Sequence, residues 1–146
     1  PGPGSMTRIV DAFEGIVHEP TQTAGAGLDL TVAAIEEIAG PGRVDFGGGE
    51  LDPAETTPHE REFRDPDDDY AWWDLDAGQY LLTYNESLVE GARATVQTRD
   101  ELLARGAFHP TLEVASLQAV PLSVGGAGLR VKENARVSTV VDVEGV

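Results

Sequence analysis

Apolar residues in this chain come in short runs, and most runs are closed by glycine, proline or aspartate. Such runs, with β-forming residues at alternate positions, are typical of strands. No repeat of solenoid or propeller length is present. The pattern therefore predicts a mostly β domain of the antiparallel barrel or double-sheet type. The expected strands span residues 28–32 with a continuation through 33–38, 43–46, 78–85, 92–97, 111–124 and 129–143.

Polar and glycine-rich stretches separate these runs. Residues 52–69 carry prolines and many charges, which is typical of a long surface loop. The pair Trp72-Trp73 that follows indicates a hydrophobic plug or a subunit contact, with stacking on a base as the alternative. Residues 125–128 (Gly-Gly-Ala-Gly) lack the lysine and helix that follow in a phosphate-binding P-loop, so we expect a turn there.

One segment has the composition of a helix, residues 99–105, which ends at Gly106. Leucine, alanine and arginine favour helix formation, and glycine is common just after a helix. Asp100 and Glu101 would lie in the first turn, where negative charge interacts favourably with the helix dipole. We therefore expect one short helix in an otherwise β-rich chain.

The chain is strongly acidic, with 26 aspartates and glutamates against 10 basic residues, of which Lys132 is the single lysine. The formal net charge of -16 disfavours binding to nucleic acids and to anionic membranes, because both require a positive surface. Acid excess, scarce lysine and the absence of cysteine indicate adaptation to a salt-rich cytoplasm, where salt screens self-repulsion. The alternative is an ordinary acidic protein.

Residues 1–5 (Pro-Gly-Pro-Gly-Ser) before Met6 are interpreted as a remnant of a cleaved tag, and residues 6–146 as a single domain. No apolar run approaches the roughly 18 residues needed to cross a bilayer, and no basic-then-apolar signal peptide precedes the domain. The absence of cysteine excludes disulfides and thiolate metal sites. We therefore expect a cytoplasmic protein.

Five segments, in order, resemble conserved segments of the dUTPase/dCTP deaminase superfamily. Residues 27–32 (GLDLTV), preceded by Gln22, resemble its G-x-D-L-T-V segment, and residues 98–106 (TRDELLARG) resemble P-R-S-S-L-L-x-x-G. The others are 42–46, which resemble the next strand of archaeal-type members, 78–86 (GQYLLTYNE), similar to P-G-x-Y-x-x-x-x-N-E, and 128–137 (GLRVKENARV), similar to G-I-R-x-x-x-G-A-R-I.

This resemblance implies a distorted jelly-roll or β-clip-like dUTPase fold that assembles as a homotrimer, with a deoxynucleoside triphosphate bound between subunits. It implies that Mg²⁺ travels with the triphosphate, with no dedicated protein cage for the metal. In dUTPases an aspartate near a tyrosine positions the attacking water. In dCTP deaminases a glutamate in the corresponding region assists attack of water on the cytosine ring.

The chain departs from the family pattern where the chemistry occurs. Asp100 and Glu101 replace the two serines, and each close like-charge pair would oppose triphosphate binding by on the order of 1 kcal/mol unless a metal intervenes. Residues 111–118 (TLEVASLQ) lack the family's tyrosine and glycines, which leaves Glu113 as the carboxylate near the catalytic position. Ser138 and Thr139 replace the alanine and glutamine that end the A-R-I-A-Q segment.

The candidate catalytic residue is Glu113, as water activator, with a structural carboxylate as the alternative. The candidate nucleotide-binding residues are Arg99, Asp100, Glu101, Arg105 and Thr139. Arginine binds phosphate bidentately, but in so acidic a chain both arginines have pairing with a carboxylate as the alternative.

His109 is either a general base or a polar turn residue. His18 and His59 show no metal-ligand spacing with it, and we expect no residues that bind a metal directly.

Three functions follow. The first is a divergent dUTPase-like nucleotide pyrophosphatase that uses Arg99, Glu113 and Arg105. The second is a non-catalytic trimeric relative that binds a nucleotide or a protein. The third is a dCTP deaminase-like enzyme that uses Glu113.

Overall fold

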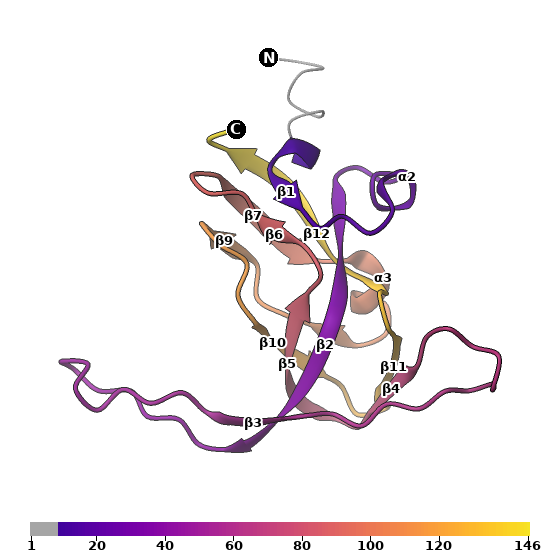
Figure 1. Cartoon of the computed structure of the whole chain (residues 1–146). Coiled ribbons are helices and arrows are strands. Elements are labelled where there is room, and N and C mark those ends of the chain that lie inside the picture. Colours follow the sequence, from indigo (N-terminus) through magenta and orange to yellow (C-terminus); the bar gives the residue numbers. More distant parts are fainter. Residues whose placement is uncertain (1–8) are drawn as a thin grey trace.

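The structure, a computed structural model, describes residues 9–146; the interpreted tag remnant, residues 1–5, lies outside the described residues. Its main feature is an antiparallel sheet of eight strands that curls on itself (Figure 1). The strands follow the order β8-β10-β5-β2-β12-β7-β9, and β3 is added to β2. The predicted mostly β, distorted jelly-roll-like domain is confirmed.

The main sheet is built from β2 (Leu28–Gly40), β3 (Glu55–Pro58), β5 (Gly78–Tyr84), β7 (Arg93–Thr98), β8 (Ala107–Phe108), β9 (Leu112–Val114), β10 (Val120–Val124) and β12 (Arg136–Glu144). Two further sheets have two strands each: β1 (Phe13–Glu14) with β6 (Ser87–Leu88), and β4 (Trp72–Leu75) with β11 (Leu129–Lys132). Two short helices, α2 (Glu19–Gln22) and α3 (Asp100–Leu103), lie between strands of these sheets. Across residues 9–146, no helix has the length and apolar character that a membrane crossing requires.

Strand β2 connects the two halves of the sheet, because it pairs with three strands along its 13 residues. Residues 28–31 pair with β12, residues 32–37 with β5 and residues 36–40 with β3. The predicted continuation of this strand through residues 33–38 is confirmed. The core includes wholly buried side chains from this strand and its neighbours, among them Leu30, Leu82, Leu122 and Val140.

The tryptophan pair divides between the core and the surface. Trp73 on β4 is 2% exposed and belongs to the core, as expected of a hydrophobic plug. Trp72 is only partly buried, and the cationic groups of Arg64 and Lys132 lie over its ring, 5.2 and 5.7 Å from the centroid.

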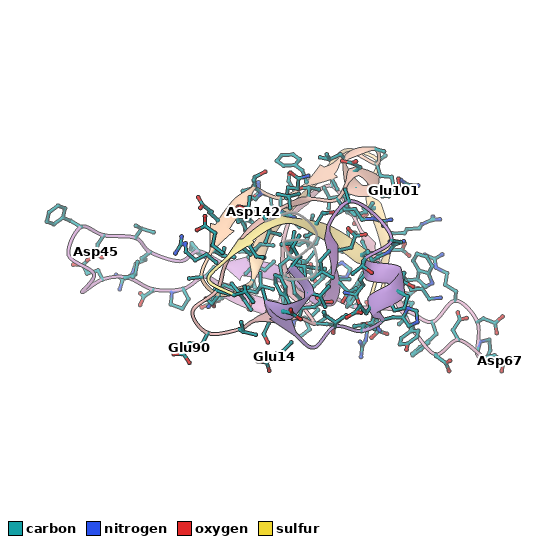
Figure 2. All side chains as sticks on the ribbon, turned by 90° about the horizontal axis from the view of Figure 1, so that it is seen from above. Glu14, Asp45, Asp67, Glu90, Glu101 and Asp142 are labelled. Atoms are coloured by element: carbon teal, nitrogen blue, oxygen red, sulfur yellow. The ribbon has the colours of Figure 1, made fainter. Side chains whose placement is uncertain are left out.

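Two sequence predictions in the first half of the chain are wrong. Residues 43–46 form no strand: Arg43 alone bridges to Asp52, and the segment belongs to an arm that protrudes from the sheet, with Asp45 near its tip (Figures 1 and 2). Val44 and Phe46 are exposed, so their apolar character marks no buried face. The expected loop 52–69 is interrupted by β3, because the long β2 offers a free edge for pairing.

Other boundaries differ because turns are hard to see in sequence. The expected strand 111–124 is two strands, β9 and β10, and the expected strand 129–143 is broken between β11 and β12. That break contains Asn134, whose φ of 66° is a left-handed conformation that asparagine tolerates. The helix expected over 99–105 is shortened to α3, and α2 was missed because it has four residues and its cap is His18.

Gly128, the last residue of the turn at 125–128, lies directly before β11. It provides a test of backbone strain. Its φ is +78°, and an added Cβ would lie 2.6 Å from the Leu75 carbonyl oxygen. We expect Gly128→Ala to lower the free energy of unfolding by about 1–3 kcal/mol, measured by urea denaturation. Gly126→Ala is the matched control, because its Cβ would meet nothing within 4 Å. Equal losses in the two variants would contradict this explanation.

Candidate functional site

Asp29 on β2 gathers residues from distant segments of the chain. Its carboxylate lies 3.1 Å from Nη1 of Arg136 and 3.6 Å from Nε of Arg99, and it accepts a hydrogen bond of 2.8 Å from the Thr139 hydroxyl. The Asp29 side chain is 10% exposed, whereas the Arg99 and Arg136 side chains are 23% and 28% exposed. We call these four residues the Asp29 cluster.

The sheet register explains why the Asp29 cluster forms. Thr139 lies directly opposite Asp29 on one side and opposite Gln97 of β7 on the other. Arg99 follows β7, and its backbone N–H donates to the Val137 carbonyl oxygen at 3.1 Å before α3 begins. Three segments that resemble the superfamily, residues 27–32, 98–106 and 128–137, thus meet here or next to it.

The Asp29 cluster combines predicted and unpredicted residues. Arg99 and Thr139 were candidates from the sequence, whereas Asp29 and Arg136 were missed. Both missed residues stand at fixed positions of the resembling segments, and that position was the signal that could have identified them.

Both arginines of the Asp29 cluster keep unused donors. Nη1 of Arg99 donates to the Arg136 carbonyl oxygen, and Nη1 of Arg136 donates to the Thr21 carbonyl oxygen. Within residues 9–146, neither Nη2 atom has a hydrogen-bond partner. Because a guanidinium is planar and always charged, it binds phosphate or carboxylate bidentately. The cluster can therefore hold an anion while Asp29 fixes the two arginines.

The other helix-segment candidates lie beside the Asp29 cluster or apart from it. Asp100 and Glu101 are exposed in the first turn of α3, directly after Arg99, as predicted. Arg105 forms an ion pair of 3.8 Å with Glu101 and lines a separate hollow of about 400 Å³ with residues 127–130. Arg99 and Arg105 are thus both paired with carboxylates in the isolated chain.

Glu113 lies apart from the Asp29 cluster within one chain. It is exposed on β9, opposite Thr95 of β7, whereas the cluster is level with Gln97 and the end of that strand. Its apolar neighbours in the sequence therefore do not bury it. One chain does not bring Glu113 and Arg99 together.

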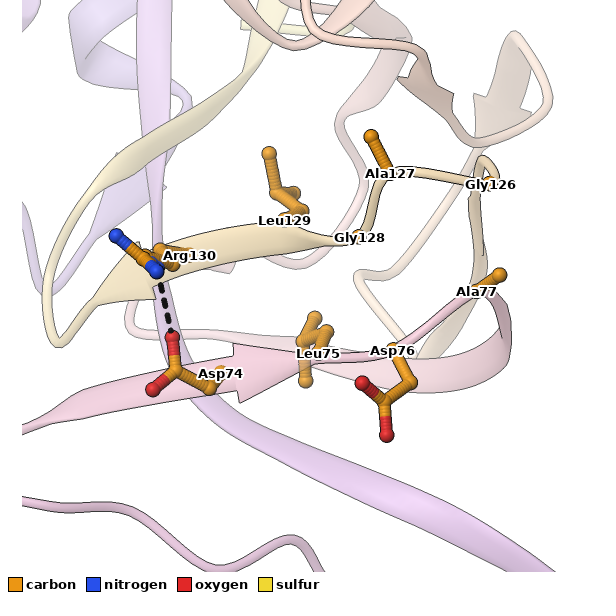
Figure 3. A pocket seen from close by; sticks show the side chains of 9 residues that line it. All are labelled: Asp74, Leu75, Asp76, Ala77, Gly126, Ala127, Gly128, Leu129 and Arg130. Carbon is orange, nitrogen blue, oxygen red and sulfur yellow. Dashed lines mark ion pairs between the residues drawn. The ribbon is translucent and has the colours of Figure 1, made fainter.

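A second hollow, of about 240 Å³, lies between β4 and the turn before β11 (Figure 3). Asp74, Asp76 and Arg130 contribute its charged side chains, and Nε of Arg130 is 3.2 Å from Oδ1 of Asp74. In the turn itself, the Gly128 N–H donates to the Gly125 carbonyl oxygen at 2.9 Å. The predicted turn at residues 125–128 is confirmed.

A buried polar chain lies inside the sheet. The Tyr84 hydroxyl is 2.6 Å from Oγ of Ser138, which is 2.6 Å from Nε2 of His109. His109 is 3% exposed and Ser138 is wholly buried. Burial lowers the pKa of the His109 imidazole below its ordinary value, so the ring is neutral at pH 7. His109 is therefore a core residue, and neither sequence interpretation, general base or polar turn residue, foresaw that.

The Tyr84 hydroxyl predicts how stability changes at alkaline pH. Burial raises its pKa from 10.0 to about 12, and the charge of Glu86 adds to the effect. Since the folded pKa lies above the unfolded value, the stabilisation is complete below pH 10 and is lost as pH rises through 12. The loss is roughly 3 kcal/mol for two pKa units. Urea denaturation from pH 8 to 11.5 should show the onset of this decline, and Tyr84→Phe should flatten it. Tyr70→Phe, at an exposed position, is the control; an unchanged slope in Tyr84→Phe would contradict the assignment.

The buried carboxylate of Glu86 supports the backbone at Asp29, together with Gln22 of α2. Glu86 is 3% exposed and accepts hydrogen bonds from Gln22 Nε2 at 2.8 Å, the Thr31 N–H at 2.9 Å and the Thr31 hydroxyl at 2.6 Å. Gln22 also donates to the Asp29 carbonyl oxygen at 2.8 Å. Glu86 and Gln22 thus hold the backbone on which the Asp29 side chain stands.

The fold has a solved counterpart. The chain is similar to the crystal structure of 2'-deoxycytidine 5'-triphosphate deaminase from Agrobacterium tumefaciens, with a TM-score of 0.61 and 13% sequence identity. The match covers 93% of this chain but only 46% of that one, so the chain spans just under half of the solved protein. This likeness shows that the two chains share a fold.

Sequence similarity to a known protein identifies the family of this chain. No family model matches the chain. It is 34% identical over 135 residues to a probable deoxyuridine 5'-triphosphate nucleotidohydrolase from Methanosarcina acetivorans, a match that covers 86% of this chain and 74% of the relative. The chain therefore belongs to the deoxyuridine triphosphate nucleotidohydrolase (dUTPase) family.

Proposed function

We propose that this protein is a nucleotide pyrophosphatase of the dUTPase family whose substrate, a deoxynucleoside triphosphate, binds at the Asp29 cluster. The observation that carries the proposal is the meeting of three family-like segments at two arginines with unused donors. Arg99 and Arg136 would bind phosphate oxygens, and Thr139 would contribute a hydroxyl. The name of the archaeal relative makes dUTP the first substrate to test.

Mg²⁺ would arrive with the triphosphate. Asp100 and Glu101 present exposed carboxylates beside Arg99, and carboxylate oxygens are suitable ligands for this ion. In the part of the chain that the structure describes, no group of three or more histidine, aspartate or glutamate side chains could hold a metal. The ion would therefore take its other ligands from phosphate and water, and it would remove the like-charge repulsion between these carboxylates and the substrate.

The proposed reaction needs a base, and the Asp29 carboxylate of the cluster is already paired with Arg99 and Arg136. A water oxygen bonds to the α-phosphorus, the bond from that phosphorus to the pyrophosphate oxygen breaks, and the water proton passes to a carboxylate. Glu113 is the proposed acceptor. Because it lies apart from Arg99 within one chain, we propose a homotrimer in which the Glu113 side chain of a neighbouring copy completes the site.

Turnover measurements test this function directly. The protein is incubated with Mg²⁺ and each deoxynucleoside triphosphate in molar KCl, because salt screens the self-repulsion of a chain with a net charge of -16. Pyrophosphate release from dUTP, lost in Glu113→Gln and retained in the control Glu144→Gln, is the expected result. If no nucleotide gives either turnover or a thermal shift, the proposal is refuted.

The second candidate is a non-catalytic nucleotide-binding or protein-binding relative. The exposed, distant position of Glu113 favours it, because binding at the Asp29 cluster does not require that residue. A thermal shift with a triphosphate but no pyrophosphate would select nucleotide binding without catalysis. Ammonia released from dCTP would instead select the third candidate, a deaminase.

A further inference from the structure

The positions of the hydrogens in the Tyr84–Ser138–His109 chain follow from its heavy atoms. Nδ1 of His109 is 2.7 Å from the Pro110 carbonyl oxygen, which can only accept, so Nδ1 carries the hydrogen. Nε2 of the neutral ring is then an acceptor, and the Ser138 hydroxyl must donate to it. Ser138 has no second hydrogen, so the Tyr84 hydroxyl donates to Ser138. Both hydrogen bonds are therefore donated in the same direction, from Tyr84 to Ser138 and from Ser138 to His109.

His109 also joins β7, which Arg99 follows, and β12, which carries Thr139. Its backbone N–H donates to the Thr98 hydroxyl at 2.9 Å, and that hydroxyl donates to the His109 carbonyl oxygen at 2.8 Å. Thr98 and Ser138 lie opposite each other on β7 and β12. His109 thus contacts both strands from the inner side of the sheet, through Thr98 and through Ser138.

The next residue along each strand belongs to the Asp29 cluster. Arg99 follows Thr98 and Thr139 follows Ser138, and successive side chains of a strand point to opposite faces. Thr98 and Ser138 are buried, whereas Arg99 and Thr139 are partly exposed and contact Asp29. A side chain that fixes Thr98 and Ser138 inside the sheet therefore fixes Arg99 and Thr139 outside it.

We propose that His109, through Ser138 and Thr98, is a positioning residue that holds Arg99 and Thr139 in place to bind the phosphates of the nucleotide. The consequence for the nucleotide rests on the proposed function; the placement of Arg99 and Thr139 does not. Ser138 is not a nucleophile, because it is wholly buried and no substrate reaches it. Ser138 stands where the superfamily segment has alanine, and Thr139 stands where it has glutamine. The hydrogen bond from Ser138 to His109 therefore occurs next to a second departure from the family pattern.

Nuclear magnetic resonance tests the positioning without any nucleotide. In the full chain at neutral pH, the His109 ring should carry its hydrogen on Nδ1, and the opposite tautomer would overturn the proposal. The hydrogen exchange of the Arg99 Nη1–H group that donates to the Arg136 carbonyl oxygen should be at least fivefold faster in Ser138→Ala and in His109→Asn. Asparagine keeps a donor near the position of Nδ1 but has no acceptor at Nε2, so it tests the same link if Ser138→Ala does not fold.

Matched variants separate positioning from a general loss of structure. Glutamine can place an acceptor near the position of Nε2. In His109→Gln the exchange rate of the arginine N–H group should therefore stay within twofold of the wild-type rate. Ser116→Ala, at an exposed serine, should change nothing. A folded Ser138→Ala variant with unchanged arginine exchange would overturn the proposal.

Binding of Mg²⁺ and a non-hydrolysable dUTP analogue then separates this proposal from the proposed function. Ser138→Ala and His109→Asn should raise the Kd by about five- to tenfold. If the wild type binds no nucleotide but exchange accelerates in the variants, the function fails and the positioning role stands. If the analogue binds equally well to wild type and variants while exchange is unchanged, the positioning role fails and the function stands.

Discussion

Replacement of Glu86 by alanine is expected to lower the free energy of unfolding by about 3 kcal/mol, because buried donors without an acceptor cost roughly 1–3 kcal/mol each. The variant would leave the Thr31 N–H and the Thr31 hydroxyl without their carboxylate, while Nε2 of Gln22 would keep only its bond to the Asp29 carbonyl oxygen. Urea denaturation at fixed KCl measures the change, since urea adds no charge to the solution.

Two variants control this measurement. Glu90→Ala removes an exposed glutamate near the end of β6 (labelled in Figure 2) and should change stability by no more than about 0.5 kcal/mol. Glu86→Gln keeps the shape but turns an amide group toward donors, so we expect an intermediate loss. A loss below about 1 kcal/mol in Glu86→Ala would contradict this expectation, because it would mean that water accepts the hydrogen bonds that the carboxylate no longer receives.

Removal of the Arg99 guanidinium should have the largest effect on nucleotide binding. Charge-assisted hydrogen bonds are worth about 1.5–3 kcal/mol, so we expect Arg99→Ala to raise the Kd for the dUTP analogue by roughly ten- to a hundredfold. Calorimetric titration at one KCl concentration measures this, because salt changes every interaction with phosphate. Arg99→Lys keeps the charge without the planar fork, and its Kd should lie between those of the wild type and Arg99→Ala.

The control for Arg99 lies at the opposite end of β7, the strand that Arg99 follows. Arg93 is exposed at the other end of β7, so Arg93→Ala removes the same charge far from the Asp29 cluster. An equal rise in Kd for the two variants would mean that net charge, not the cluster, determines affinity. An unchanged Kd in Arg99→Ala would remove the phosphate-binding role of this residue.

Several parts of this fold could be read from the sequence because they depend on neighbouring residues. Alternation and glycine-rich turns located β2, β5 and β7, and the turn at residues 125–128 was clear from its composition. The local sequence pattern gave a wrong prediction where no partner strand was available. Residues 43–46 alternate like a strand, yet they lie on an arm without a sheet beside it. The helix α2 was missed because four residues are too few to show a helical period.

The candidate site divides in the same way. Arg99 and Thr139 could be predicted because they stand in segments that resemble the superfamily. Their contact with Asp29 could not, because it depends on which residue of β12 lies opposite β2. Glu113 has apolar neighbours in the sequence but is exposed, since β9 lies at the edge of the sheet. The burial of His109 likewise depends on Thr98 and Ser138, which are 11 and 29 residues away.

The sequence by itself determined that this chain is β-rich and acidic, that it resembles the dUTPase/dCTP deaminase superfamily, and that Arg99 remains while the two serines of that segment and the later glutamine do not. Only the tertiary structure decided that Asp29 joins Arg99, Arg136 and Thr139, and that His109 holds their strands from inside. The physical reason is that alternation assigns each side chain to a face, whereas strand order and register come from contacts between residues far apart in the chain.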